Sequence, residues 1–324
     1  MHPSNTLIQA IEKHESFALH AHLNPDADSL GSVFALSLIL KKLGKKVLIY
    51  CEDRLEDRFY YLPQSDLLEH STLKQVLRKK PSAYICLDTA KWELATRESP
   101  FPSITLPVIN IDHHGDNNIK STLSWIDASA PATAVMIYHL LKPLGVEIDA
   151  DIAHCLLAGI LGDTGFFTNT NTTADIFSLT HELIVAGADY NQHVLYLNRT
   201  SDFKLWKPWQ LLIKNLTLSA DGTYVYTTIS REEYVELDYP LEIAPFANIV
   251  INSIRGTRFG AILVEKTRGV VKGSLRARLP DVDVTALAHA LGGGGHPASC
   301  GFRLDLPLDQ AVQAFHDAAT QLKP

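Results

Sequence analysis

Cysteine is scarce in this sequence and never occurs in a paired motif. Cys51, Cys86, Cys155 and Cys300 stand singly among 324 residues, without a C-x-x-C spacing. Zinc knuckles need that spacing, and disulfide-framed domains need sets of closely spaced cysteines. The pattern therefore indicates neither, and we expect reduced thiols.

Long apolar runs and an excess of basic charge are also missing. The longest apolar runs fall well short of the roughly 20 residues that span a bilayer. The first residues lack the basic segment and apolar core of a secretory signal. We therefore expect a soluble, cytoplasmic protein with no membrane partner. The formal net charge of -7 argues against a protein that coats long nucleic acid through a broad basic face. Any nucleic-acid substrate is expected to be short.

What the chain does contain suits two folded domains. With 324 residues, of which 46% are hydrophobic, the chain is too long to fold around one hydrophobic core of ordinary size. After a predicted amphipathic helix (1–15) come an apolar strand (17–23), a helix (30–43) capped by Asp28 or Ser29, and a second strand (46–50), an order that predicts a parallel sheet. From Thr223 the pattern changes to short strands and helices, with a predicted antiparallel hairpin of 259–266 and 270–278.

We therefore predict an α/β protein with its active site in the cleft between two domains. The larger N-terminal domain has a mainly parallel sheet flanked by helices, and the smaller α/β C-terminal domain has a mixed sheet. The predicted boundaries are a metal-binding domain at 1–189, a helical connector at 190–216 and a substrate-binding domain at 217–324.

Four apolar segments end in carboxylates or imidazoles. The residues at these ends are His22, Asp26 and Asp28, then Asp88, then Asp112, His113 and His114, and finally Asp163. No Lys or Arg lies inside these four motifs, and burying carboxylates together without counter-charge is costly. Divalent cations are the natural counter-charge, so the sequence predicts a metal site.

The spacing distributes these ligands over two ions. His22 and Asp26 face one ion, Asp28 faces its neighbour, Asp88 bridges both, and His113 with Asp163 completes the second. Mixed imidazole and carboxylate ligands suit Mn(II) better than calcium or structural zinc. Two ions about 4 Å apart can lower the pKa of a bridging water and stabilise charge on phosphate oxygens. Phosphoester hydrolysis is the predicted chemistry.

Each position taken alone also has an ordinary structural explanation. His22 could be a hydrogen-bonded core histidine and Asp163 a turn former; it is their combination that favours metal. His20 is predicted to be structural, and Asp112 to support a neighbouring imidazole rather than bind metal directly.

The C-terminal part carries a glycine run and several basic residues. The run 292–295 precedes His296 and an immediate return to strand, which predicts a fixed turn with amides open to an anion or a base edge. Arg276 and Arg278 alternate along one strand and could hold a phosphate. Arg255, Arg258 and Lys272 either extend this basic face or are solvated surface.

These motifs, in this order, resemble the DHH phosphoesterase superfamily, and within it the two-domain nanoRNase/pAp phosphatase group. The resemblance covers nearly the whole chain. The motifs that carry it are His22-Leu23-Asn24-Pro25-Asp26-Ala27-Asp28-Ser29-Leu30-Gly31-Ser32, Leu87-Asp88-Thr89, Asp112-His113-His114, Gly162-Asp163-Thr164-Gly165, Ser274-Leu275-Arg276 and Gly292-Gly293-Gly294-Gly295-His296.

The resemblance implies a metal-dependent hydrolase with two Mn(II) ions on the six ligands named above. His114 is implied to contact the scissile phosphate, so His114 and Asp88 are the expected catalytic residues. Arg276, Gly293, Gly294 and His296 are implied to grip the far end of the substrate. The other expected substrate contacts are Asn24, Arg255, Arg258 and Arg278.

The implied activity is hydrolysis of very short RNA oligonucleotides, including dinucleotides such as pApA and pGpG, to mononucleotides. Removal of the 3′-phosphate of pAp and formation of a homodimer are expected by family analogy. The alternatives are a cyclic dinucleotide (c-di-AMP) phosphodiesterase, a RecJ-like single-strand exonuclease, a manganese inorganic pyrophosphatase and a non-catalytic nucleotide-binding regulator. The arginine-bearing hairpin argues against the pyrophosphatase, and the net charge argues against the exonuclease.

Overall fold

The computed structural model describes residues 2–99, 103–199, 203, 206–237, 246–247, 250–279 and 281–320. It divides into two compact units, Met1–Thr200 and Ser201–Pro324. The division falls inside the range 190–216, where we expect the connector. Each unit has its own sheet and its own hydrophobic core.

The first unit is built on a six-stranded parallel sheet with the order β3-β2-β1-β4-β5-β6. The strands are β1 Ser16–His20, β2 Lys46–Cys51, β3 Glu69–His70, β4 Ala83–Leu87, β5 Val108–Asp112 and β6 Leu123–Ile126. The predicted parallel sheet is confirmed. The sequence analysis missed β3 and β6, because one has two residues and the other lies at the sheet edge with its side chains partly or fully exposed.

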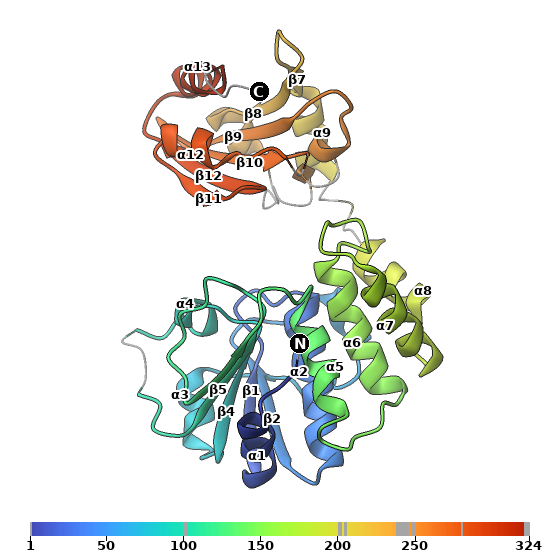
Figure 1. The fold of residues 1–324 in the computed structure, drawn as a ribbon. Helices are drawn as coiled ribbons and strands as arrows, with labels where there is room; N and C mark the ends of the chain where they lie inside the picture. The colour runs from blue at the N-terminus through green and yellow to red at the C-terminus, as the bar shows by residue number, and fades with distance from the viewer. Residues whose placement is uncertain are drawn as a thin grey trace. The chain divides into compact units, whose positions relative to one another are not determined.

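Helices cover both faces of this sheet (Figure 1). Their bounds are α1 Asn5–Lys13, α2 Ala27–Lys42, α3 Leu73–Arg78, α4 Trp92–Ala95, α5 Thr133–Leu141, α6 Ala150–Asp163, α7 Ala174–Val185 and α8 Tyr190–His193. The largest core cluster joins α1, α2, α5, α6 and α7 to one face of the strands. A smaller cluster joins α3 and Trp92 of α4 to the other face, around Tyr50 and Tyr84.

The strand order reverses beside β1. From β1 the chain builds outward through β2 and β3, and it then returns to build β4, β5 and β6 on the other side. In open α/β sheets, ligands bind at the carboxyl ends of the strands next to such a reversal. The loops after β1, β4 and β5 leave the sheet at this end, and these loops carry the acids and histidines singled out above.

Three boundaries in the first unit differ from the prediction. Helix α2 begins at Ala27, so its cap is neither Asp28 nor Ser29; Asp26 caps it, and Asp26 Oδ1 accepts the N–H groups of those two residues at 3.0 Å. Strand β1 ends at His20, which leaves His22 in the following loop. The sequence predicts a helix over 151–161, but helix α6 extends to Asp163, which is its last residue.

Helices α2 and α6 approach each other at backbone distance. A Cβ atom added to Gly31 would lie 2.4 Å from the carbonyl oxygen of Cys155 and 2.9 Å from the amide nitrogen of Gly159. Such a close approach is open only to glycine. It brings the first turn of α2, which contains Asp28, against the C-terminal half of α6.

The second unit has a mixed sheet with the order β11-β12-β10-β9-β8-β7. Its elements are α9 Trp206–Lys214, β7 Thr217–Leu218, β8 Tyr224–Ile229, α10 Arg231–Glu236, β9 Phe259–Thr267, β10 Val270–Ala277, α12 Thr285–Ala290, β11 Gly294–His296, β12 Ser299–Leu304 and α13 Leu308–Ala319. Strands β8 and β9 are parallel and the other pairs antiparallel, so the predicted hairpin of β9 and β10 is confirmed. Helices α12 and α13 cover one face of this sheet, and α9 packs on the other.

Two predictions in this unit are wrong in detail. The glycine run is not one turn, because Gly294–His296 pairs with β12 as a strand. Strand β10 ends at Ala277, so Arg278 lies beyond it. The sequence also predicts a helix around 241–254, which falls partly outside the described residues; within them, Ile251–Ser253 forms a 3-10 turn. Among the helices of the described ranges, none combines the length and the apolar character needed to cross a bilayer.

We expect Gly31→Ala to destabilise the first unit by about 1–3 kcal/mol, because its methyl group would force apart two backbones that cannot yield locally. The free energy of unfolding from urea denaturation measures this effect. Lys41→Ala, on the exposed last turn of the same helix, is the control and should change the free energy by less than about 0.5 kcal/mol. Equal stability of Gly31→Ala and the wild type would contradict the close approach.

Candidate metal centre

Metal-competent side chains gather at the carboxyl end of the first sheet. They form three groups: His22, Asp26 and Asp88; Asp28, His113 and Asp163; and Asp88, Asp112, His113 and His114. Within each group, one ligand atom from every residue lies within 4.8 Å of the others. The first two groups together contain all six ligands named from the sequence, and Asp88 belongs to the first of them.

Asp88 lies between the two positions. Its Oδ2 is 3.6 Å from His22 Nε2, and its Oδ1 is 3.5 Å from His113 Nε2. The backbone of Asp88 is left-handed, with a φ of 51°, a conformation that non-glycine residues rarely adopt. This sharp turn after β4 directs each carboxylate oxygen toward a different imidazole. The side chain therefore has the geometry of a bridge.

Both imidazoles are held in the same manner. His22 Nδ1 donates to the carbonyl of Leu23 at 2.9 Å, and His113 Nδ1 donates to the carbonyl of Ala130 at 3.2 Å. A carbonyl can only accept, so Nδ1 carries a proton in each ring. Nε2 of each ring faces carboxylates: Asp26 Oδ1 is 3.7 Å from His22 Nε2, and Asp163 Oδ2 is 3.0 Å from His113 Nε2. Metal-binding histidines are typically oriented in this way.

Asp28 is fully buried and is fixed by the start of α5. Its Oδ2 accepts the N–H of Thr133 at 2.6 Å, and its Oδ1 accepts the N–H of Ala134 at 2.9 Å and the hydroxyl of Ser32 at 3.2 Å. The hydroxyl of Thr133 also donates to Asp88 Oδ1 at 3.1 Å. The sequence analysis missed Thr133. Pro131 marks the start of a helix, and the first amides of a helix need hydrogen-bond acceptors from outside it. This was the signal that the residues just after Pro131 contact another segment.

Two asparagines fix the backbone at Asp163. The carbonyl oxygen of Asp163 accepts the side-chain amide of Asn169 at 2.9 Å and that of Asn171 at 3.2 Å. Asn171 also donates to the carbonyl of Pro131 at 3.0 Å. The end of α6 is thereby tied to the segment before α5, and no motif in the sequence pointed to these residues.

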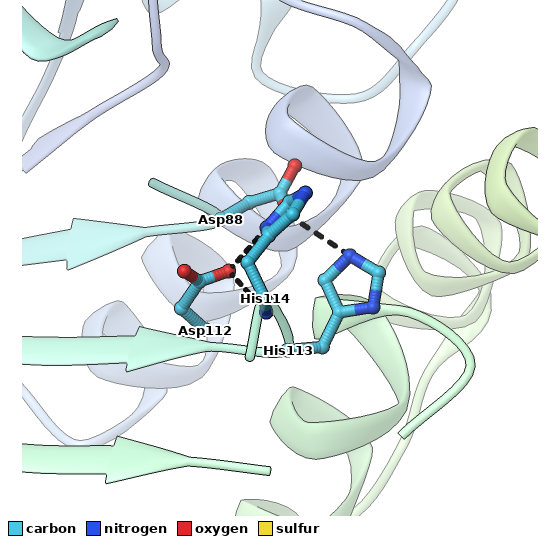
Figure 2. Close-up of side chains that lie close together, drawn as sticks. All are labelled: Asp88, Asp112, His113 and His114. Atoms are coloured by element: carbon cyan, nitrogen blue, oxygen red, sulfur yellow. Dashed lines mark hydrogen bonds and ion pairs between the residues drawn. The ribbon is translucent and has the colours of Figure 1, made fainter. Parts of the chain in front are cut away.

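Asp112 and His114 form a pair at the end of β5 (Figure 2). Asp112 is fully buried; its Oδ1 accepts from His114 Nδ1 at 2.8 Å, and its Oδ2 accepts from Asn117 at 2.6 Å. Both oxygens are therefore occupied by hydrogen bonds, as suits a residue that supports an imidazole. The side chain of His114 is 47% exposed, so the ring is open to a ligand. The hydrogen bond that His114 donates to Asp112 raises the pKa of His114.

Residues outside the three metal-competent groups hold the loop that carries His22 and Asp26. Asn24, which is exposed, has a left-handed backbone with a φ of 51°, and its N–H donates to Asp53 Oδ2 at 2.7 Å. Arg97 binds both oxygens of Asp53, at 2.7 and 2.9 Å. Asp53 and Arg97 were also missed from the sequence, because neither belongs to a motif.

Charge dominates the chemistry of this cluster. Burial and the nearby charges of Asp88 and Asp163 raise the pKa of Asp28 well above its usual range. Burial lowers the pKa of His22 and His113, but neighbouring carboxylates outweigh it and raise these values to about 11 and about 10. Within the described ranges, the ion pairs of the six predicted ligands involve histidine and carboxylate alone. Oxygen and imidazole donors with excess negative charge fit divalent ions such as Mn(II).

The predicted substrate residues of the second unit only partly come together. Arg276 pairs in register with Ser299, and Ser299 pairs with His296, so the three lie in a row across β10, β12 and β11. Gly293 and Gly294 adjoin this row at the start of β11; a Cβ at Gly293 would lie 2.1 Å from the carbonyl oxygen of Gly301.

Three predicted arginines lie away from this row. Arg255 and Arg258 precede β9, and Arg278 follows the end of β10. Arg278 Nη1 donates to the carbonyl of Thr257 at 3.3 Å instead of standing beside Arg276 as a second phosphate clamp.

Comparisons with known proteins agree on one family. The family described as "DHH family, N-terminal domain" matches residues 16–160. A Thermus thermophilus protein described as "Bifunctional oligoribonuclease and PAP phosphatase NrnA" is 32% identical over 308 residues, which is 93% of this chain and 88% of that protein.

Solved structures share the fold. An exopolyphosphatase-related protein from Bacteroides fragilis has a TM-score of 0.83 and 22% identity, covering 98% of this chain and 95% of that one. A structure of the exonuclease RecJ bound to manganese has a TM-score of 0.51 and 14% identity, covering 98% of this chain and 94% of that one.

We expect Mn(II) binding to release protons. At neutral pH the metal-free imidazoles of His22 and His113 are protonated, because their pKa values are raised to about 11 and about 10, and ligation requires a deprotonated Nε2. The apparent affinity should therefore rise with pH through neutrality and fall toward acid. Titration calorimetry in two buffers of different ionisation enthalpy counts the released protons. Identical observed enthalpies in the two buffers would contradict this assignment.

Proposed function

This chain belongs to the DHH family, and we propose that it is a metal-dependent phosphoesterase that hydrolyses very short RNA oligonucleotides to mononucleotides and removes the 3′-phosphate of pAp. The observation that carries the proposal is the place of Asp88 between two ligand groups: it belongs to the group of His22 and Asp26, and its other carboxylate oxygen lies 3.5 Å from Nε2 of His113 in the second group. The relative that is described as an oligoribonuclease and PAP phosphatase matches 93% of this chain, so both units are included in the similarity.

In this proposal the six ligands hold two divalent ions. His22 and Asp26 serve one position, Asp28, His113 and Asp163 serve the other, and Asp88 serves both. Ions held there would supply a water of lowered pKa and neutralise charge on the phosphate oxygens. Manganese is the proposed ion, supported by the mixed imidazole and carboxylate donors.

The residues around the ligands have separate roles. The hydrogen bond to Asp112 orients the ring of His114, which is placed beside Asp88 to contact a phosphate oxygen. Thr133 and the start of α5 keep Asp28 and Asp88 oriented. In the second unit, Arg276 and His296 are the proposed contacts for the far end of the substrate, supported by their place in one row. Formation of a homodimer stays a prediction.

A comparison of substrates tests the proposed function. Initial rates with Mn(II) are measured for pAp, a dinucleotide, a 5-mer, a 24-mer, cyclic di-AMP and pyrophosphate. We expect the dinucleotide and pAp to be hydrolysed much faster than the 24-mer and pyrophosphate. Far faster hydrolysis of pyrophosphate would indicate a pyrophosphatase, and equal rates on the 24-mer would indicate a single-strand exonuclease. No hydrolysis of any substrate would favour a nucleotide-binding regulator.

Asp88→Ala should abolish hydrolysis even at saturating Mn(II), because the substitution removes a ligand from both metal positions. We expect a loss of at least about 10³-fold in kcat, on the order of 4 kcal/mol of transition-state stabilisation. The variant should keep its fold, as judged by circular dichroism. Asp66→Asn, which changes an exposed carboxylate outside the cluster, is the matched control. Near-normal turnover by Asp88→Ala would refute the shared ligand.

A further inference from the structure

The sheet of the second unit carries cations beyond the row of Arg276, Ser299 and His296. Lys272 on β10 and Arg303 on β12 are cross-strand partners. Together with Lys266, Thr267 and Val270 they line a cavity of about 310 Å³. Three of these five residues are basic, and none of the described residues that line the cavity is acidic. Such a cavity suits an anionic group.

The cavity lies on the same sheet face as that row. Side chains alternate along β10: Val271 and Leu275 are buried in the core that contains α12 and α13, so Lys272, Ser274 and Arg276 occupy the opposite face. The cross-strand pairs continue this face onto β12 as Arg303, Gly301 and Ser299. Arg276 and Lys272 are four residues apart, about 13 Å along an extended strand, so they are too distant to bind one phosphate.

The middle of this face consists of Ser274 on β10 and of two glycines, on β12 and β11, that packing does not require. Gly294 and Gly301 are cross-strand partners between the two ends. A Cβ at Gly301 would meet its nearest heavy atom at 3.7 Å, and one at Gly294 at 3.8 Å, which are ordinary contacts. Folding therefore does not require glycine at these positions. The absent side chains leave an open strip along which a nucleotide backbone can approach the sheet.

Two of the three cations of the cavity, Lys266 and Arg303, have restraining contacts that leave them available to a ligand. Lys266 Nζ lies 5.6 Å from the centre of the Tyr234 ring, which restrains the amine through a cation–π contact. Arg303 uses Nε and Nη2 to bind Asp305 at 3.1 and 3.0 Å. Both side chains of that pair are largely exposed, and such pairs are weak. A phosphate can therefore displace Asp305 and form charge-assisted hydrogen bonds with Arg303.

We propose that Lys266, Lys272 and Arg303 form a second phosphate site for the substrate backbone, which oligonucleotides longer than a dinucleotide reach. This inference rests on the proposed function and adds a determinant of substrate length to it. A dinucleotide engages the Arg276 end of the face alone. A longer oligonucleotide also places a backbone phosphate in the cavity, so the cavity increases the preference for substrates of a few residues.

The test is the double variant Lys272→Ala/Arg303→Ala in the full chain. We expect the ratio of kcat/KM for a 5-mer to that for a dinucleotide to fall about tenfold. The slope of log(kcat/KM) for the 5-mer against log salt concentration should become less negative by about one to two, because two phosphate contacts are lost. Arg268→Ala removes the same kind of charge from the tip of the same hairpin but lines a different cavity, and it should leave both quantities unchanged. An unchanged ratio in the double variant would overturn the proposal.

A binding measurement separates this inference from the proposed function. Fluorescence anisotropy of a labelled 5-mer in the presence of EDTA reports affinity without hydrolysis. We expect the double variant to bind the 5-mer about tenfold more weakly than the wild type. If the double variant binds more weakly but the wild type hydrolyses no substrate, the second phosphate site is supported and the proposed activity is rejected. Equal affinities, or displacement of the 5-mer by an equal concentration of inorganic phosphate, would reject the assignment to an oligonucleotide backbone.

Discussion

The first unit depends on one electrostatic constraint: its buried carboxylates need positive charge close to them. Asp28 and Asp88 are buried at the end of the parallel sheet, close to Asp26 and Asp163. Three histidines, His22, His113 and His114, are the ion-pair partners of Asp26, Asp88 and Asp163 among the described residues. Clustered carboxylates without compensation shift their pKa values and become protonated. The raised pKa values of Asp28, His22 and His113 are the signature of this imbalance, and divalent ions are the charge that resolves it.

Helix packing sets the positions of the ligands as much as the loops do. A Cβ at Gly159 would lie 2.6 Å from Asp28 Oδ1 and 2.6 Å from the Cβ of Ala134. The absence of a side chain at Gly159 therefore leaves room for the carboxylate between α2, α5 and α6. The amides at the start of α5 then fix both oxygens of Asp28. A small residue in a helix core, outside the motifs recognised in the sequence, is thereby part of the site.

The sequence allows prediction where a feature is local. The sequence predicts a helix near 73–78 and an apolar strand over 83–87, which are the bounds of α3 and β4. The ends of β1, β4 and β5 lead into the expected acids and histidines. The helix cap was misassigned to Asp28 or Ser29, because three neighbouring polar side chains can each cap a helix and the choice depends on tertiary contacts. Contacts between distant segments were not predictable, including those from Thr133, Asn171 and Asp53. The glycine run was interpreted as a turn because its pairing with β12 depends on the sheet rather than on its own residues.

The central claim is that two divalent ions bind on either side of the Asp88 carboxylate. Diffraction from crystals grown with manganese, recorded on both sides of the manganese absorption edge, tests this claim most directly. The account predicts two anomalous peaks, one beside His22 and Asp26 and one beside Asp28, His113 and Asp163, with Asp88 contacting both. A single peak away from Asp88, or none at saturating manganese, would contradict it.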